Sequence, residues 1–218
     1  MYRGKTLGLY LNAYGIKLEE VNGAIYSKDK DKFDFIISKT RTNFTEPFET
    51  GETIEKVIHD IVFGDFSQIR QNTAYYYGAI EFCSAFRIKL PHFLEIKYSF
   101  QTDKINYLLA DDFNIQGFDI NDLIGANPGV LEMPDIFSTF DEDLYECPAL
   151  GFLIRPNLNL MKDKLKKITI KAAAIKKLIN SKDQEEISKG IEYQNIKQLK
   201  ENINYCVRNK LEMMTICG

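Results

Sequence analysis

The two histidines of the chain, His59 and His92, are candidates for metal binding or acid–base catalysis. His59 follows Glu55 by four residues, which places both side chains on one face of a predicted helix. The pair could supply two ligands to a metal ion, but two ligands do not complete a site. A surface or capping histidine is therefore the simpler interpretation. His92 directly follows Pro91 in a predicted loop, and the sequence alone assigns it no role.

Carboxylates are concentrated in one part of the chain. Segment 105–154 contains no Lys or Arg. Its ten acidic residues are Asp111, Asp112, Asp119, Asp122, Glu132, Asp135, Asp141, Glu142, Asp143 and Glu146. The run 141–143 has the composition of a divalent-cation cluster but lacks the Gly and the ordered spacing of a calcium loop, so we interpret it as a solvated acidic loop. Carboxylates are too abundant here for one acid–base pair to be singled out.

Motifs that bind phosphates or dinucleotides are not found in the sequence. There is no G-x-x-x-x-G-K-[ST] loop and no G-x-G-x-x-G after a strand. We therefore expect no cofactor. Nucleophilic triads usually need a His near a Ser or Cys, and neither histidine indicates one. The sequence favours a protein without enzymatic activity but does not decide whether the protein is an enzyme.

Three consecutive tyrosines, Tyr75, Tyr76 and Tyr77, are a second candidate feature. On a helix they point in different directions, so we expect one or two of them to reach the surface. Exposed tyrosines are enriched at protein interfaces because they combine a large apolar area with a polar tip. Partial burial with satisfied hydroxyl groups is the simpler interpretation.

The formal net charge of −3 conceals an uneven distribution. Residues 1–104 contain 14 basic and 14 acidic groups, segment 105–154 has a net charge of −10, and residues 155–218 contain 14 basic and 7 acidic groups. In one interpretation, which we favour, the acidic segment packs beside a lysine-rich helix predicted at 160–179 and the two partly neutralise each other. In the other, an acidic surface recruits a basic protein partner and speeds association.

The lysine-rich helix is also compatible with a membrane-surface or nucleic-acid element. Its lysines are better explained as the solvated face of a core helix, since no aromatic residue interleaves with them. We therefore expect neither nucleic acid nor a membrane as a partner. The sequence does not indicate an oligomeric state.

Hydrophobic patterns in the first part of the chain predict one strand followed by helices. Residues 6–14 are rich in Leu and Tyr and predict the strand. A helix begins near Ser27 or Asp29, either of which can cap it. The clearest helix begins around Thr53, where apolar residues recur with a period of 3.6.

The middle of the chain predicts further helices and then loops. A helix covers roughly 73–89 and must end before Pro91. A weaker helix is predicted around 103–110. The Gly- and Pro-rich stretch 111–149 predicts turns and loops with one short helix at 119–124.

The last third predicts two strands with helices between them. A short apolar run predicts a buried strand at 149–155. Asn157 or Asn159 caps the lysine-rich helix at 160–179, and a final helix leads into a strand at 211–217. The fold class is therefore α+β, mostly helical, with a small sheet built from both ends of the chain. We expect a single domain over 1–218 with a loop-rich acidic segment at 105–148.

Composition and length bound the class of protein. Apolar residues make up 44% and charged residues 27% of the 218 residues, so disorder and fibrous structure are excluded. No apolar run is long enough for a signal peptide or a membrane span. The four cysteines, Cys83, Cys147, Cys206 and Cys217, form no C-x-x-C pair and are most simply thiols. We expect a cytoplasmic protein.

The order of elements resembles an uncharacterised bacterial family, a domain of unknown function. The resemblance is spread along almost the whole chain. It rests on Gly8-Leu9-Tyr10, Ser27-Lys28-Asp29, Tyr76-Tyr77-Gly78-Ala79-Ile80-Glu81 followed by Leu90-Pro91, Gly151-Phe152-Leu153, and a terminal helix running into a strand that ends near Cys217. The resemblance implies a single domain and supplies no catalytic residues.

Two hypotheses for function follow from these observations. The first is a non-enzymatic protein-binding module, such as an immunity or inhibitor protein, that uses an acidic surface to bind a basic partner. Its candidate binding residues are Asp111, Asp112, Asp141, Glu142, Asp143, Tyr75 and Tyr76. The alternative is a metal-dependent hydrolase or transferase, with carboxylate ligands from 105–154 and a contribution from His59 or His92.

Overall fold

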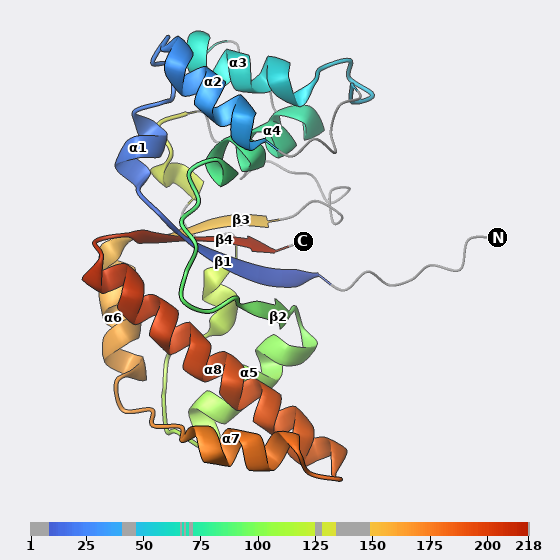
Figure 1. Ribbon diagram of the computed structural model, residues 1–218, viewed down its shortest axis with the longest axis vertical. Coiled ribbons are helices and arrows are strands. Elements are labelled where there is room, and N and C mark those ends of the chain that lie inside the picture. The colour runs from blue at the N-terminus through green and yellow to red at the C-terminus, as the bar shows by residue number, and fades with distance from the viewer. Residues whose placement is uncertain are drawn as a thin grey trace, which may run out of the picture.

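A four-stranded antiparallel sheet crosses the middle of the molecule (Figure 1). The computed structural model describes residues 9–40, 47–65, 67, 69, 72–124, 128–133 and 149–217. The strands are β1 (Tyr10–Ile16), β2 (Glu95–Lys97), β3 (Ala149–Leu153) and β4 (Glu212–Cys217), in the order β2-β1-β4-β3. The α+β class and the predominance of helix are confirmed, as are three of these strands. The three-residue β2 was not predicted.

Strand β4 lies in the interior of the sheet. Thr215 is opposite Ala13 of β1 on one side and opposite Gly151 of β3 on the other. The sheet is therefore built from both ends of the chain, as predicted. The first strand begins at Tyr10 and ends at Ile16, later than the predicted 6–14, and residues 1–8 lie outside the described residues.

Helices cover both faces of the sheet (Figure 1). The helices of one layer are α1 (Leu18–Asn22), α2 (Lys30–Lys39), α3 (Ile54–Phe63) and α4 (Thr73–Ser84), with the short η3 (Pro128–Val130) beside them. The helices of the other layer are α5 (Phe100–Asp111), η2 (Ile120–Leu123), α6 (Arg155–Leu165), α7 (Ala172–Ile179) and α8 (Gln184–Arg208).

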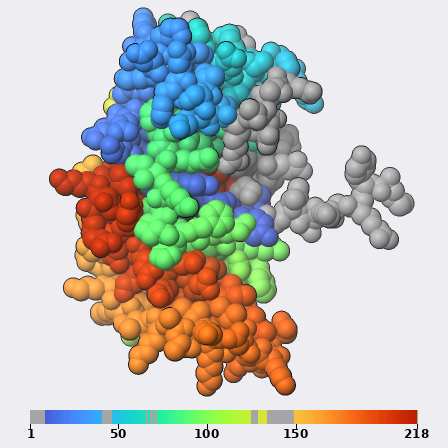
Figure 2. All heavy atoms as spheres, viewed as in Figure 1, coloured from blue at the N-terminus to red at the C-terminus, as the bar shows by residue number. Residues whose placement is uncertain are grey.

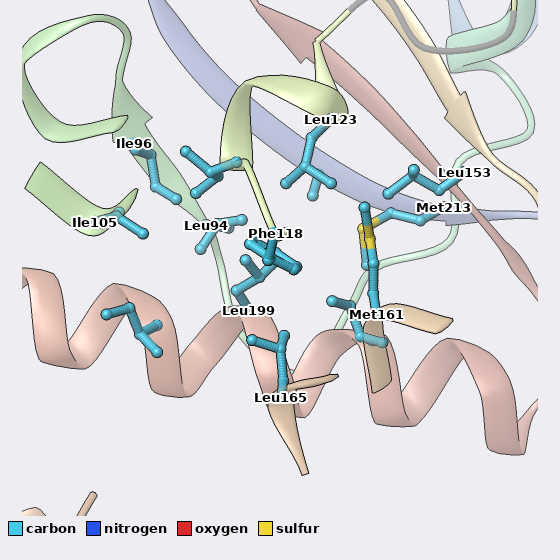
Figure 3. Packing of buried hydrophobic residues seen from close by; sticks show 14 of the residues in the cluster. Leu94, Ile96, Ile105, Phe118, Leu123, Leu153, Met161, Leu165, Leu199 and Met213 are labelled. Carbon is cyan, nitrogen blue, oxygen red and sulfur yellow. The ribbon is translucent and has the colours of Figure 1, made fainter. Parts of the chain in front are cut away.

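The strands send alternate side chains into two separate apolar cores. In β1, Leu11 and Ala13 belong to the core under α5, α6 and α8, whereas Ile16 belongs to the core under α3 and α4. This alternation is the period of two expected for a strand. In the first of these cores Leu94, Phe118 and Leu199 lie close together, although they come from distant parts of the chain (Figure 3).

Capping side chains fix where the helices of the first layer begin. Asp29 accepts hydrogen bonds from the backbone N–H groups of residues 31 and 32, and Thr53 accepts one from that of residue 56. Both predicted starts are confirmed, and the apolar stripe of α3 is buried as expected. Helix α4 ends at Ser84, before the predicted residue 89, because the following chain extends and pairs Ile88 with Gly15 of β1.

The predicted helix at 160–179 is wrong, because the chain forms α6 and α7 instead. Helix α6 begins at Arg155 with Pro156 in its first turn, where a missing N–H costs nothing. It ends before the β-branched run 168–170, which disfavours helix. Lys200 of α8 donates hydrogen bonds to the carbonyl oxygens of Lys166 and Ile168 at 3.2 and 2.6 Å. The break between α6 and α7 is therefore stabilised by a side chain of another helix.

A glycine sets the spacing between α3 and α4. A Cβ placed on Gly78 would lie 2.3 Å from Cγ1 and 2.7 Å from Cβ of Val57. These distances are too short for carbon atoms in contact. Since Val57 is fully buried, its side chain has no free space to move into, and the two helices pack closely only because residue 78 has no side chain.

We predict that Gly78→Ala lowers the free energy of unfolding by about 1–3 kcal/mol, because α3 and α4 must move apart. Chemical denaturation measures this change. Gly129→Ala is the matched control, since a Cβ there meets no atom within 4 Å, and its effect should stay below about 1 kcal/mol. Equal stabilities of the two variants would contradict the close packing.

Candidate functional site

Half of the carboxylates of the acidic segment fall within the described residues. These are Asp111, Asp112, Asp119, Asp122 and Glu132. The other five carboxylates lie outside the described residues, and they are Asp135, Asp141, Glu142, Asp143 and Glu146. The predicted binding role of residues 141–143 therefore stays a prediction.

Asp112 is neutralised within the chain by α8. Its Oδ2 atom lies 2.7 Å from Nζ of Lys189 and accepts a hydrogen bond of 2.5 Å from the hydroxyl of Tyr193. Burial by itself raises the pKa of Asp112, but these two hydrogen bonds outweigh it and hold the pKa below its usual range. Asp112 is thus neutralised within the chain, but by a lysine of α8 and not by one from the predicted partner, residues 160–179.

Asp111, by contrast, belongs to an exposed face of α5. This face, which we call the acidic aromatic face, consists of Phe100, Asp103, Tyr107 and Asp111. The spacing of three, four and four residues aligns all four side chains on one side of the helix. The side chains of Phe100 and Tyr107 are 66% and 63% exposed. Within the described chain, neither Asp103 nor Asp111 forms an ion pair.

The aromatic members of this face were missed by the sequence analysis. A signal for Tyr107 existed, because Ile105, Leu108 and Leu109 define the buried side of the predicted helix and Tyr107 falls opposite to them. Phe100 lies before the predicted helix start at residue 103. In the structure α5 begins at Phe100, and only this earlier start aligns Phe100 with Tyr107.

The two tyrosines assigned to partner binding do not reach the surface. Tyr75 and Tyr76 are only 2% and 6% exposed, so the expectation of an exposed tyrosine is wrong at these positions. Tyr75 donates a 2.6 Å hydrogen bond to the buried Asp60, which also lies 2.5 Å from Nζ of Lys56. The tyrosine hydroxyl thus links α4 to α3. Burial favours the neutral form of Asp60, but the bonds from Lys56 and Tyr75 outweigh it and lower the pKa.

His59 packs against two aromatic rings, and its Nδ1 atom lies 3.7 Å from Oδ1 of the adjacent Asp60. Its ring centroid lies 5.9 Å from that of Phe33 and 4.9 Å from that of Phe63. In the part of the chain that the structure describes, no three His, Cys, Asp or Glu side chains come together in a way that could hold a metal ion.

The described cysteines are buried thiols. Cys83 lies in the core under α3 and α4, and Cys206 and Cys217 lie in the other core. Burial raises the pKa of all three, to about 12 for Cys206 and about 11 for Cys217. Such thiols are poor nucleophiles because the reactive thiolate is scarce near neutral pH.

His92 forms a close pair with Glu201 of α8, which the sequence did not indicate. Nε2 of His92 lies 2.6 Å from Oε2 of Glu201, and both side chains are partly exposed. The neighbouring Asn202 is fully buried. It accepts a 3.1 Å hydrogen bond from the backbone N–H of His92 and donates a 2.9 Å bond to its carbonyl oxygen. These two bonds fix the loop that positions the imidazole.

Glu192 is a buried carboxyl group between α8 and α5. Its side chain is 1% exposed and accepts a 3.1 Å hydrogen bond from Nδ2 of Asn195. Burial raises the pKa of Glu192 above its usual range, and the hydrogen bond from Asn195 and the nearby charge of Lys104 offset only part of that rise.

Comparisons with known proteins provide no relative from which to transfer a function. No family model matches this chain, and no curated protein or solved structure is significantly similar to it. The resemblance to a bacterial domain of unknown function therefore stays a hypothesis. No helix among the described ranges has the length and apolar character needed to cross a membrane.

We predict that Asn202→Ala lowers the free energy of unfolding by about 2–3 kcal/mol, because two backbone groups of His92 lose their partner. Urea denaturation measures the loss. Gln198→Ala on the same helix is the control and should cost less than about 1 kcal/mol, since its side chain is partly exposed. Similar losses in both variants would show that the His92 loop does not depend on Asn202.

A second prediction concerns the pH dependence of stability. The folded-state pKa of Glu192 lies above the unfolded value of about 4.3. A raised carboxyl pKa contributes stability at low pH that is lost as the pH rises through the folded-state pKa. Glu192→Gln cannot ionise, so it should gain stability relative to the parent protein as the pH rises above about 4.3. Denaturation at a series of pH values tests this, and a stability difference between the two proteins that does not change with pH would contradict it.

Proposed function

We propose that this protein is a non-enzymatic, cytoplasmic protein-binding module of the immunity or inhibitor type. The observation that supports this proposal best is the acidic aromatic face of α5. Two large rings are left in solvent there, and two carboxylates without an ion pair in the described chain lie beside them. The buried free thiols of the two cores are compatible with a reducing compartment.

The composition of this face favours a protein as the partner. Aromatic side chains provide most of the energy at protein interfaces because they bury a large area with little loss of conformational freedom. Phe93 and Tyr98, which precede α5 in the sequence, are also exposed. Exposed apolar side chains that gather on one surface are typical of protein interaction sites.

The charge of this face favours a basic partner. Asp103 and Asp111 remain available for ion pairs, whereas Asp112 is already paired with Lys189. Carboxylates at the rim of an aromatic patch attract a basic protein and increase the association rate. The carboxylates of residues 141–143, whose binding role stays a prediction, would add to this attraction. Within the described residues, no observation favours the alternative metal-dependent hydrolase or transferase.

The proposal predicts a site-specific cross-link. A photoreactive phenylalanine derivative placed at position 107 should form a covalent adduct with a basic protein in the native host. The same derivative at Phe35 of α2 should not, because Phe35 is also exposed but lies in the other helical layer. Mass spectrometry identifies the adduct.

Charge reversal separates specific binding from chance capture. Asp103→Lys with Asp111→Lys should abolish the adduct, and raising the salt concentration in lysate should reduce it, since exposed charges are screened. Asp31→Lys with Asp34→Lys on α2 is the matched control. An adduct that survives reversal on α5, or the same adducts from both positions, would refute the proposal.

A further inference from the structure

A basic hollow surrounds the His92–Glu201 pair. Three adjoining hollows of about 380, 330 and 550 Å³ share Glu201 as a lining residue, and His92 lines the first and the third. The cations that line them are Lys162, Lys176, Lys197, Lys200 and Arg208. Glu201 is the one carboxylate among the described residues that line them. On the face seen in Figure 2, the green segment before β2 lies next to the orange-red helix α8.

The single carboxylate does not neutralise these cations. Glu201 lies 2.6 Å from His92 and 4.0 Å from Nζ of Lys197, so its charge is already shared. Lys162, Lys176 and Arg208 form no ion pair within the described part of the chain. Several like charges around one concave surface produce a positive potential that attracts an anion.

The first hollow also has an apolar wall. Ala172, Ile175 and Ile179 of α7 form this wall, and Gln194 and Gln198 of α8 lie among its other lining residues. Its volume of about 380 Å³ is in the range of small-molecule sites. An inorganic anion would leave the apolar wall unused, whereas an organic molecule with one strongly anionic group would contact both parts.

The walls of this hollow are held in place by close packing. A Cβ on Gly190 would lie 2.8 Å from Cβ of Leu178 and 2.9 Å from the backbone nitrogen of Ile179, so glycine lets α7 lie directly against α8. Asn202 fixes the loop that positions His92. A preformed site of this kind loses little conformational freedom when a ligand binds.

We propose that this hollow binds a small phosphate monoester. Its phosphate oxygens would interact with Lys176, Lys197 and the imidazole of His92, and its organic part would lie against the apolar wall of α7. A phosphate dianion is favoured over a single carboxylate because it can accept bonds from several cations at once. This proposal is independent of the acidic aromatic face, which involves none of these residues.

The lining residues favour a small ligand over a nucleic acid strand. Proteins that bind single strands stack bases on exposed aromatic side chains. Apart from the His92 ring, none of the described residues lining the three hollows is aromatic. Three of the five cations lie on α8, and the other two come from α6 and α7, so the cations of three helices meet around these hollows.

Isothermal titration calorimetry on the full chain tests the proposal with phenyl phosphate, inorganic phosphate and phenol as probes. Phenyl phosphate should bind best, inorganic phosphate more weakly, and phenol not measurably. Lys197→Gln should weaken phenyl phosphate binding about tenfold or more, as expected for loss of one charge-assisted hydrogen bond. Lys177→Gln removes the same charge from α7 outside the hollows and should change affinity less than twofold.

Three outcomes would overturn the proposal. The first is no binding of phenyl phosphate to the parent protein at low ionic strength. The second is equal weakening by both lysine variants, which would indicate a diffuse electrostatic effect. The third is displacement of phenyl phosphate by a short single-stranded oligonucleotide of higher affinity, which would indicate a nucleic-acid surface instead. Thermal denaturation of each variant verifies that it is folded.

Discussion

Strand β4 is hydrogen-bonded along both edges, to β1 and to β3, and helices pack on both faces of the sheet that it completes. Its alternate side chains, Met213 and Met214 among them, therefore enter opposite cores. Glu212 at its start accepts hydrogen bonds from Nε of Arg155 and from the backbone N–H of Leu18, which joins α6 and α1 to the same strand. Helices α6 and α8 pack directly against β4, and α5 and α7 pack against α8. The helices that form the acidic aromatic face and the basic hollow therefore depend on this strand, either directly or through α8.

Helix α8 explains how a chain with a net charge near zero can present two surfaces of opposite sign. On one side it faces α5, where Lys189 and Tyr193 hold Asp112. On another side it lines the basic hollow through Lys197 and Glu201. Internal neutralisation is therefore local. Among the residues that the structure describes, it leaves Asp103 and Asp111 without an ion pair on one flank of α5, and it leaves lysines of α6 and α7 without one near His92.

Much of the fold could be predicted because the relevant signals are local in the sequence. The cap at Thr53 and the apolar stripe after it define α3 without any distant contact. The break between α6 and α7 could not be predicted with the same assurance, because the apolar spacing continues through it and Lys200 stabilises it from another helix. The His92–Glu201 pair joins residues far apart in sequence. A periodic pattern predicts only neighbours within one helix or strand, so it could not predict this contact. Tyr75 is buried because Asp60 provides a partner for its hydroxyl, which sequence spacing alone does not reveal.

The pairing of Leu11 with Cys217 also has a consequence for biosynthesis. While the ribosome is still making the segment between them, β1 has no β4 beside it, and an apolar strand edge remains open. Folds dominated by such distant pairings form slowly and expose aggregation-prone surfaces before they close. The helices around Val57 and Gly78, whose contacts are nearer in sequence, can form earlier on the growing chain. This protein should therefore depend on chaperones more during synthesis than its final stability would indicate.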